Sequence, residues 1–463
     1  MIHVIGGGLA GTEAAWQAAS MGVEVRLYEM RPVRSTAVHH TDRLAELVCS
    51  NSFRGNKLEN AVGLLKEEMR RMNSLVIRTG DRTQVPAGTA LAVDRKLFAD
   101  EVTSAVQAHP LITIDRTEIE AIPKGLTPME PSIIATGPLT SERLSADIAA
   151  FVGADHLYFY DAISPIVLAE TIDWKRVFRA SRWGRDSVET APGTSSDQQP
   201  GDYVNCPLTA DEYDRFFEAL TNAESATVHD FDHAKFFEGC LPIEVMASRG
   251  RDTLRFGPMK PVGLIDPHGG GPPPHAVVQL RQDNLAGDHF SLVGFQTQLK
   301  WGEQDRVLRL IPGLEQAEFV RFGMIHRNTY INAPTVLRQT WQTRQREDLF
   351  FAGQLSGVEG YVESAASGLM AGLNAAAIVQ RREPLVAPRT TALGALAYYV
   401  SHAAASDYQP TNIAFGIMPP LAKAPRRRAA RRLATAERAL RDLDMWRSEV
   451  GLECDAQSTQ SLS

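Results

Sequence analysis

The chain has few of the residues that stabilise secreted or metal-bound proteins. It contains four cysteines among 463 residues, and these are scattered: Cys49, Cys206, Cys240 and Cys454. Their spacing fits neither a disulfide framework nor a zinc site, so we expect no metal. Free thiols are typical of a reducing compartment, and the sequence therefore predicts a cytoplasmic protein.

Long apolar runs are also missing. We find no run that approaches the ~20 residues needed to cross a bilayer, which argues against membrane insertion. The first residues enter a strand-like segment without a preceding basic stretch, so we expect no signal peptide. Hydrophobic residues make up 44% of the chain, which is enough for a large core and for two or three domains.

The chain as a whole has no excess of positive charge, but a segment near its end does. The net charge is −7, which argues against a wholly basic nucleic-acid binder. The segment from Leu421 to Arg441, however, holds eight Lys and Arg residues against the single Glu437, so it carries +7 while the rest carries −14. Two interpretations stay open: a helix whose basic face suits a phosphate backbone, or a solvated terminal helix that pairs with acidic neighbours.

A glycine-rich turn stands directly after the first strand-like run. The residues Gly6-Gly7-Gly8-Leu9-Ala10-Gly11 have the spacing of a dinucleotide-binding fingerprint. In that fingerprint Gly6 allows a tight turn, Gly8 lets the backbone approach a pyrophosphate, and Gly11 lets the helix pack on the strand. The helix predicted from Glu13 to Met21 would point its N-terminal amides at the phosphates.

A second strand, from Val23 to Tyr28, places an acidic residue at the offset expected for a ribose contact. Glu29 follows this strand 18 residues after Gly11, and its carboxylate is the predicted acceptor for a ribose hydroxyl. The competing interpretation is a glycine-rich turn that binds nothing. Strand, helix, second strand and acid in register favour the dinucleotide site.

A second signature, near the other end of the chain, suggests a flavin. A strand from Leu349 to Ala352 ends at Gly353, and after a loop comes a helix of small residues that contains Glu363. A helix with so little bulk can lie very close to a ring, and its positive N-terminus would favour an anionic reduced flavin. The alternative is a close-packed helix with no ligand. Thr136 and Gly137, at the end of a third strand-like segment, are expected to join the same site.

The order of these segments predicts an α/β fold in which a cofactor domain is interrupted by an insertion. We expect a Rossmann-like FAD-binding domain of the glutathione-reductase type, formed by residues 1–140 and 320–463, and an inserted α/β substrate domain at 141–319. Further elements predicted are helices at Asp94–Gln107, Ala210–Asn222 and Glu303–Leu310 and strands at Leu111–Asp115 and Glu118–Ile122.

Two cysteines and one polar stretch are candidates for chemistry. Cys49 lies among serine and asparagine, which favours exposure and thiolate character, and Cys240 lies on an irregular segment. Isolated cysteines are more often small buried hydrophobic residues, and that alternative stays open for both. His326 can stack on a flat heterocycle and Arg327 can bind a carboxylate, unless the stretch is only a polar strand end.

Several longer strings resemble one family. The chain is similar to the bacterial folate- and FAD-dependent tRNA uracil-54 carbon-5 methyltransferases (TrmFO), which are related to the MnmG/GidA family. The matching strings are Gly6 to Glu13, Tyr28 to Pro32, Val48 to Ser52, Ala135 to Ser141, Asp161 to Val167, Phe256 to Leu264, His326 to Tyr330 and Gly357 to Ser364. The resemblance extends to about Pro420 and is weak beyond it.

The resemblance implies a reaction. Cys240 would add to carbon-6 of uracil and so activate carbon-5, which then attacks a methylene group from 5,10-methylenetetrahydrofolate. Reduced FAD would supply the hydride that completes the methyl group, and NADH or NADPH would reduce the flavin again. Cys49 would lie over the flavin, His326 would stack on the pterin, and Tyr361 would remove the carbon-5 proton.

The resemblance also implies contacts and partners. The cofactor-binding residues would be Gly6, Gly7, Gly8, Leu9, Ala10, Gly11, Glu29, Thr136, Gly137, Gly353 and Glu363. The expected partners are tRNA, folate and a nicotinamide nucleotide, with no membrane and no obligate protein partner. Three alternatives remain: an MnmG-type enzyme of the wobble uridine, which has a longer helical C-terminal part, an NAD(P)H-dependent flavoprotein oxidoreductase of small molecules, and a non-enzymatic RNA-binding flavoprotein.

Overall fold

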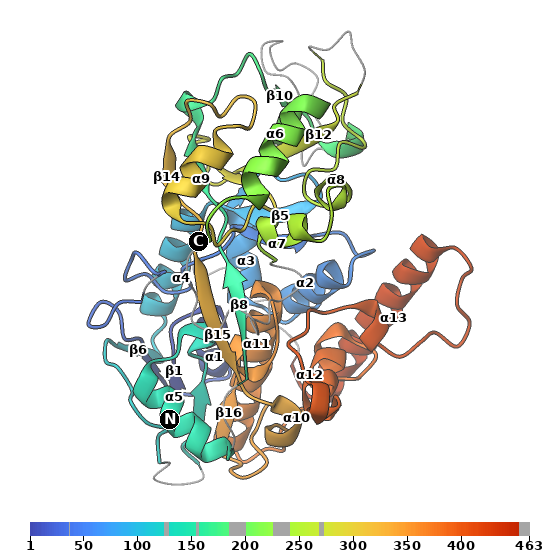
Figure 1. The fold of residues 1–463 in the computed structure, drawn as a ribbon. Helices are drawn as coiled ribbons and strands as arrows, with labels where there is room; N and C mark the ends of the chain where they lie inside the picture. Colours follow the sequence, from blue (N-terminus) through green and yellow to red (C-terminus); the bar gives the residue numbers. More distant parts are fainter. Residues whose placement is uncertain are drawn as a thin grey trace.

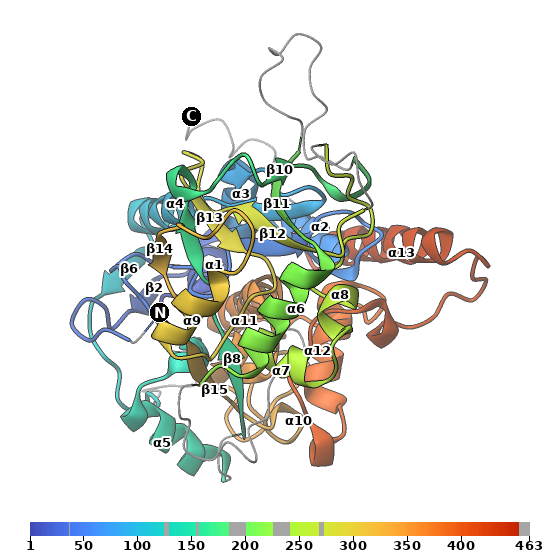
Figure 2. The ribbon, with the colours of Figure 1, turned by 45° about the horizontal axis from the view of Figure 1, so that its top comes forward.

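The chain folds into two lobes, which Figures 1 and 2 show from two directions. The computed structural model describes residues 1–36, 38–124, 129–153, 157–184, 201–225, 241–267 and 273–452, without the side chains of residues 157–162, 325–328 and 407. The lobe in the lower half of Figure 1 holds a parallel sheet, and the upper lobe holds an antiparallel sheet.

Five short strands form the parallel sheet of the first lobe. Across the sheet they are β16 (Leu349–Phe351), β7 (Ser132–Ile134), β1 (Ile2–Ile5), β2 (Val25–Tyr28) and β6 (Ile112–Asp115). Every neighbouring pair is parallel. Strands β16, β7 and β1 are mostly apolar and almost wholly buried, as expected where helices cover a parallel sheet. Strands β2 and β6 also carry exposed polar residues, Arg26 and Thr113. An α/β fold with a parallel sheet is therefore confirmed.

The strand predicted at Glu118–Ile122 is wrong. The chain leaves the sheet after β6, and residues 116–120 have no regular structure. Glu118 forms an ion pair with Arg34 at 2.6 Å, and Glu120 forms one with Arg143 at 2.5 Å. These charged residues therefore find partners on other segments and not on a neighbouring strand, and alternation alone does not make a strand without a pairing partner.

Helices surround the parallel sheet. They are α1 (Leu9–Ser20), α2 (Ala61–Arg71), α3 (Leu75–Arg82), α4 (Arg95–Ala108), α5 (Glu142–Val152), α10 (Ala333–Val336), α11 (Tyr361–Val379), α12 (Ala392–His402) and α13 (Arg428–Glu449). Helix α4 confirms the helix predicted at Asp94–Gln107. It begins there because the Asp94 side chain caps it and accepts from the Leu97 N–H at 2.9 Å. Helix α1 begins earlier than predicted, directly after the glycine-rich turn.

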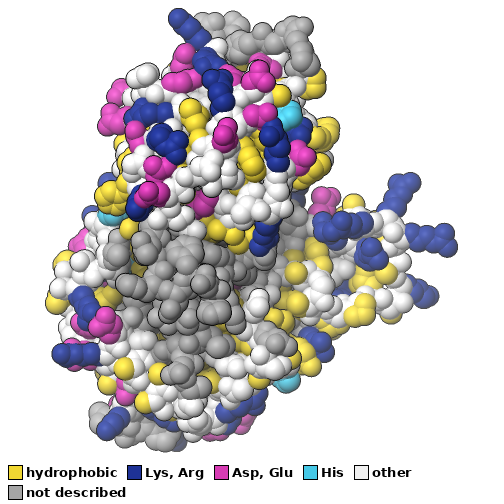
Figure 3. Space-filling view, in the orientation of Figure 1, with side chains coloured by type: hydrophobic (Ala, Val, Ile, Leu, Met, Phe, Trp, Pro, Cys, Tyr) yellow, Lys and Arg dark blue, Asp and Glu magenta, His cyan; other side chains and the backbone are white. Residues whose placement is uncertain are grey.

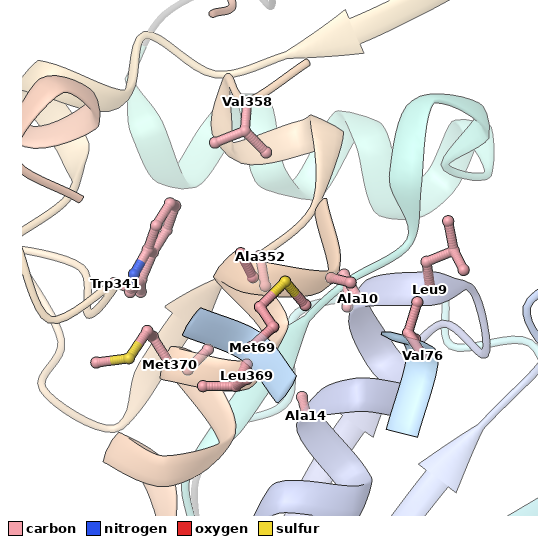
Figure 4. Close-up of a cluster of buried hydrophobic side chains, with 14 of the residues drawn as sticks. Leu9, Ala10, Ala14, Met69, Val76, Trp341, Ala352, Val358, Leu369 and Met370 are labelled. Carbon is pink, nitrogen blue, oxygen red and sulfur yellow. The ribbon is translucent and has the colours of Figure 1, made fainter. Parts of the chain in front are cut away.

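Helices α1 and α11 pack with almost no side chain between them. A methyl group built on Gly368 of α11 would lie 2.1 Å from the carbonyl oxygen of Ala10, and one on Gly372 would lie 2.3 Å from that of Ala14. Figure 4 shows Ala10 and Ala14 in this core near Leu369. The small residues of the rear helix therefore serve close contact with the front helix.

Helix α11 also corrects the expectation that no segment is apolar enough to cross a membrane. Among the described residues it passes that test by length and composition, with 19 residues and a mean hydropathy of 1.3. However, 83% of its most apolar window is buried inside the protein. Its apolar surface is covered by the sheet and by α1 and α2, which is the behaviour of a core helix.

The second lobe is built on a six-stranded sheet. Its order is β10 (Phe178–Arg179), β11 (Tyr203–Leu208), β12 (Ala276–Gln282), β13 (His289–Leu292), β9 (Ile166–Leu168) and β14 (Phe319–Arg321), with every pair antiparallel. Its helices are α6 (Ala210–Thr221), α7 (Ile243–Ser248), α8 (Thr253–Phe256) and α9 (Trp301–Leu308). Helices α6 and α9 confirm the two helices predicted in this region.

Two smaller sheets connect the lobes. Strands β8 (Leu157–Ala162) and β15 (Ile325–Tyr330) form an antiparallel ribbon that runs between them in Figure 1. Strands β3 (Ser52–Gly55), β5 (Ala90–Val93) and β4 (Gln84–Val85) form a sheet next to the second lobe, where the Tyr203 hydroxyl donates to the Ala87 carbonyl at 2.9 Å. The domain boundaries at residues 140 and 320 stay a prediction.

The contact between α1 and α11 gives a test of stability. We expect Gly368→Ala to lower the free energy of unfolding by about 2 kcal/mol or more, because the added methyl group meets backbone that has no room to move. The measurement is urea unfolding followed by circular dichroism.

Gly302→Ala is the matched control, because no described residue lies within 4 Å of the position its methyl group would take in α9. That variant should be unchanged or slightly more stable, since alanine favours a helix over glycine. Equal stability of both variants would show that α1 and α11 are not in close backbone contact.

Candidate functional site

A cavity of about 560 Å³ lies where the first lobe meets the second. Its lining comes from the glycine-rich turn (Gly6 to Ala10), the end of β2 (Tyr28 to Arg31), residues Val48 to Ser50, the end of β7 (Thr136 to Ser141), the six-stranded sheet (Arg281 and Ser291 to Gly294) and the rear loop (Gly353, Gln354 and Glu359 to Tyr361). The cavity therefore brings both ends of the predicted cofactor signature together with the residues around Cys49.

Glycine is favoured at Gly6, Gly8 and Gly11 of the front turn for a different physical reason at each position. Gly6 has a positive φ of 106°, and a methyl group on it would lie 2.5 Å from the Ala135 carbonyl oxygen. One on Gly11 would lie 1.8 Å from the Gly6 carbonyl oxygen, so this position holds helix against strand. Among the described residues, nothing lies within 4 Å of a methyl group built on Gly8, and no side chain caps α1. The open space at Gly8 and the uncapped start of α1 suit a phosphate group.

Glu29 lies beside this turn, as predicted. Its carboxylate accepts from the Gly7 N–H at 3.0 Å and from the Arg31 N–H and Nε at 3.0 and 2.9 Å. Burial alone would raise the pKa of Glu29, but the hydrogen bonds and charge of Arg31 outweigh it and hold the pKa below its usual value. Arg31 also pairs with Glu46 at 2.9 Å. An ionised acid is therefore fixed next to the predicted phosphate position.

The rear signature reaches the cavity from the opposite side. Thr136, Gly137 and Gly353 all line it. Gly353 has a positive φ of 74°, and its N–H donates to the hydroxyl of Ser367 in α11 at 2.7 Å. Glu363 is not among the lining residues, because its buried carboxylate accepts from the Ile413 N–H at 2.9 Å and pairs with Arg54.

Tyr361 binds the loop that carries Cys49. Its hydroxyl accepts from the backbone N–H groups of Cys49 and Ser50 at 2.9 and 3.2 Å and lies 3.0 Å from the Cys49 sulfur. Because the oxygen already accepts twice, its own proton is free to point at the sulfur. Burial, together with the nearby Cys49, raises the pKa of Tyr361 well above 10, so this hydroxyl is protonated at neutral pH.

Two arginines also bind the backbone of the loop that carries Cys49. Arg95 donates to the Leu47 carbonyl at 2.9 Å and pairs with Asp283 at 2.9 Å. Arg321 donates to the Val48 carbonyl at 3.3 Å, and its Nε and Nη2 have no hydrogen-bond partner among the described residues. Burial, with the charge of Arg95, lowers the pKa of Arg321 to about 10. Arg321 is therefore still a cation at neutral pH.

A third arginine completes this cluster. Arg281 of β12 donates to the Ser50 hydroxyl at 2.9 Å and to the Asn51 side-chain oxygen at 2.8 Å. Three cations thus surround the loop, and positive charge near a thiol favours the thiolate. The sequence did not indicate these arginines, because they come from α4, β12 and β14 and belong to no motif.

Several predicted site residues lie outside this description. Cys240 and Cys454 fall outside the described residues. His326 and Arg327 lie on β15, paired with Asp161 and Tyr160 of β8, but their side chains are not described.

Cys206, the remaining cysteine, is fully buried in the second lobe, and burial raises the pKa of its thiol far above the ordinary value. It therefore stays a thiol and does not take part in the site. Within the described segments, no three His, Cys, Asp or Glu side chains lie close enough together to hold a metal ion.

His39 gives the cavity a pH-dependent stability. Burial, with the charge of Arg31, lowers the pKa of His39 to about 4. His39 is neutral in the folded protein, but in the unfolded chain it takes up a proton below pH ~6.5. Proton uptake therefore favours the unfolded state as the pH falls from 6.5 towards 4, and the free energy of unfolding decreases. We expect about 1–2 kcal/mol of stability to be lost between pH 7.5 and pH 5 through this group.

The measurement is urea unfolding at both pH values. His39→Gln should lose that part of the pH dependence, whereas His40→Gln, which changes the exposed neighbour, should retain it. An identical pH dependence in the two variants would show that His39 is not buried as described.

Comparison with known proteins assigns the chain to a family. The family model of glucose inhibited division protein A matches residues 1–383. The crystal form II structure of Aquifex aeolicus GidA superposes with a TM-score of 0.69 at 19% sequence identity, covering 99% of this chain and 74% of that chain. At this identity the likeness concerns the fold alone.

Sequence relatives are much more similar. The methylenetetrahydrofolate–tRNA-(uracil-5-)-methyltransferase TrmFO of Bacillus cereus strain G9842 is 56% identical over 440 residues, which cover 95% of this chain and 97% of that protein. The TrmFO of Bacillus anthracis strain A0248 is 57% identical over the same length and coverage. With such identity over almost its whole length, the chain belongs to the TrmFO family.

Proposed function

We propose that this protein transfers a one-carbon group from 5,10-methylenetetrahydrofolate to carbon-5 of a uridine in tRNA, at position 54 of the T-loop. The proposal rests on the family relationship and on one observation above all: the cysteine loop held by Tyr361 and the dinucleotide fingerprint line one cavity. A reaction that uses both a redox cofactor and a thiol needs the two groups close together in one cavity.

FAD is the dinucleotide that we propose for the cavity, and the first lobe would then be a Rossmann-like FAD-binding domain of the glutathione-reductase type. The open space at Gly8 and the uncapped start of α1 fit a pyrophosphate. Glu29, at the end of β2, is the residue that we propose accepts from a ribose hydroxyl. The chemistry supplied by the bound flavin is transfer of the methylene carbon together with a hydride, and NADH or NADPH is the proposed source of electrons.

The uracil itself needs activation, because its carbon-5 is a weak nucleophile. We propose Cys240 as the thiolate that adds to carbon-6. The bond from sulfur to carbon-6 forms first, and carbon-5 then bonds to the methylene carbon. Loss of the carbon-5 proton expels the nitrogen that carried the methylene carbon and leaves an exocyclic methylene on carbon-5. A hydride then adds to that methylene to complete the methyl group, and the bond from carbon-6 to sulfur breaks and releases the thiolate. Folate and tRNA are therefore both substrates of this site.

Cys49 and its neighbours would protect and orient the reacting groups. The Tyr361 hydroxyl donates towards the Cys49 sulfur, and Arg95, Arg281 and Arg321 supply positive charge around the loop. Removal of the carbon-5 proton by Tyr361 stays a prediction; its raised pKa makes the phenolate a strong base but a rare species at neutral pH. His326 and Arg327 are proposed to meet the pterin and a folate carboxylate.

A GidA-type reaction on the wobble uridine is the second candidate, because the fold resembles Aquifex aeolicus GidA over 99% of this chain. The sequence favours the first candidate, since identity is 56–57% to TrmFO proteins and 19% to that GidA. Both candidates predict the same cavity, so the position of the modified uridine separates them.

The proposed reaction is tested with a labelled donor. Anaerobically reduced protein is mixed with an unmodified tRNA transcript and methylenetetrahydrofolate labelled in its methylene carbon, and the digested RNA is examined for labelled 5-methyluridine. We expect label at the T-loop uridine. Label at the wobble position would favour the GidA-type reaction, and no label in RNA while NADPH reduces the flavin would favour a small-molecule oxidoreductase.

Variants of the cysteines refine this test. Cys240→Ala should abolish labelling, by a factor of at least about 10³ for loss of a nucleophile, while the protein stays yellow. Cys206→Ala is the control, because that buried thiol does not line the cavity, and it should keep its activity. A fully active Cys240→Ala protein would overturn the proposed nucleophile.

Gly8→Ala tests the cofactor position. Since no described residue lies within 4 Å of the added methyl group, the flavin-free variant should unfold within about 1 kcal/mol of the original protein. The methyl group would occupy the space proposed for the pyrophosphate, so we expect flavin affinity to fall at least tenfold, measured by fluorescence titration. Gly11→Ala, which meets the Gly6 carbonyl, should instead destabilise the fold, and unchanged flavin affinity in Gly8→Ala would place the pyrophosphate elsewhere.

A further inference from the structure

Helix α13 extends away from the body of the protein. Its second half packs on α2 through five buried side chains, Ala436, Ala439, Leu440, Leu443 and Trp446. Its first turns, from Arg428, carry exposed residues on every side. Figures 1 and 2 show this part of the helix standing free at the right. The helix is therefore anchored at one end and projects as an arm at the other.

The free end of the arm is basic. Exposed side chains there and just before it are Lys423, Arg426, Arg427, Arg428 and Arg431, and Figure 3 shows Lys and Arg side chains gathered at this tip. In the part of the chain that the structure describes, none of these cations lies within 4.0 Å of a carboxylate. The ion pairs of α13 lie at its anchored end, where Asp444 pairs with Arg71 at 2.5 Å and with Arg447 at 3.7 Å. Among the described residues, the arm therefore does not fit the interpretation that this segment pairs with acidic neighbours.

These charges do not stabilise the helix that carries them. The start of a helix favours acidic residues, yet the first turn of α13 has none, and its N-cap residue Arg427 makes no capping hydrogen bond. Arg427 and Arg431, and likewise Arg428 and Arg432, are four residues apart, where like charges repel. The arrangement opposes local stability, which is expected when residues serve a partner.

The anchored half of α13 lies one helix away from the cavity. Helix α13 packs on α2, and Lys66 of α2 donates to the backbone carbonyls of Phe53 and Gly55 at 2.8 Å each. These residues belong to β3, whose Ser52 and Arg54 line the cavity. A helix is about 10 Å across and rises about 1.5 Å per residue, so the free end at Arg428 lies roughly 15–20 Å beyond the anchored residues Ala439 and Leu440. A nucleic-acid strand carries a charge about every 3.4 Å along its axis, so an RNA with a base in the cavity would meet the arm through phosphates on the order of eight nucleotides away.

From this placement we infer that the basic end of α13, residues 426–431, binds the phosphate backbone of the tRNA substrate while the target uridine is in the cavity. The inference rests on the proposed function for the identity of the RNA. Arginine suits this contact because its planar fork binds phosphate oxygens in pairs. Such contacts position the RNA without reading its sequence.

The test compares two triple variants that remove the same charge. The first is Arg427→Gln, Arg428→Gln and Arg431→Gln. The second, the control, is Arg43→Gln, Arg82→Gln and Arg143→Gln, which removes three exposed arginines that pair with carboxylates elsewhere on the surface. Binding of an unmodified tRNA transcript to each full-length, flavin-loaded protein is measured by filter binding at several salt concentrations.

We expect the arm variant to bind the transcript at least tenfold more weakly at 0.1 M salt. The slope of log K against log salt concentration should fall by about 3, close to one per lost phosphate contact. The Michaelis constant for tRNA should rise while the turnover at saturating tRNA stays within about twofold. The control triple variant should keep the original slope.

Each other outcome overturns the inference. An unchanged slope in the arm variant, or an equal fall in both variants, would show that the arm makes no specific phosphate contact. Loss of binding to vesicles of anionic phospholipid with an unchanged tRNA slope would make the arm a membrane-surface element. Failure of the proposed function is a separate result: the original protein would then bind the transcript without methylating it, whatever the arm variant does.

Discussion

The cofactor lobe depends on the close backbone contact between α1 and α11. Two glycines of α11 rest on two alanines of α1, and a methyl group on Gly353 would lie only 3.0 Å from the Ala10 side chain. Because no bulky side chain separates the helices, the rear loop lies directly against the glycine-rich turn. Two segments from opposite ends of the chain therefore form one wall of the cavity.

A second constraint is the desolvation of three arginines around Cys49. A buried cation is tolerated only when hydrogen bonds and opposite charge compensate for lost water. Here much of that compensation comes from the loop itself, through the carbonyls of Leu47 and Val48 and the side chains of Ser50 and Asn51. The hydrogen bonds that fix the loop come from the same guanidinium groups that supply its positive charge. A change in the conformation of the loop would therefore also change the electrostatic potential at the Cys49 sulfur.

The sequence predicted the parts of this site that depend on local spacing. The glycine turn, Glu29 after β2 and helix α4 follow rules that span a few residues, and each takes the place in the fold that those rules predict. The strand at Glu118–Ile122 failed because a partner strand is not a local property. Arg95, Arg281 and Arg321 could not be predicted, since only the packing of α4, β12 and β14 brings them together. The role of Cys240 stays a prediction that derives from resemblance alone.

The strand order of the parallel sheet has a consequence for how the protein is made. Strand β7 lies between β1 and β16, but β16 is synthesised only after the whole second lobe. At ~5–20 residues per second, residues 135–348 take roughly 10–40 s to leave the ribosome. During that time β7 has an open edge and the small-residue face of α1 has no cover. The nascent chain thus passes through a period in which the first lobe is exposed to misassembly, and the second lobe, whose core is its own, can fold ahead of the lobe that precedes it.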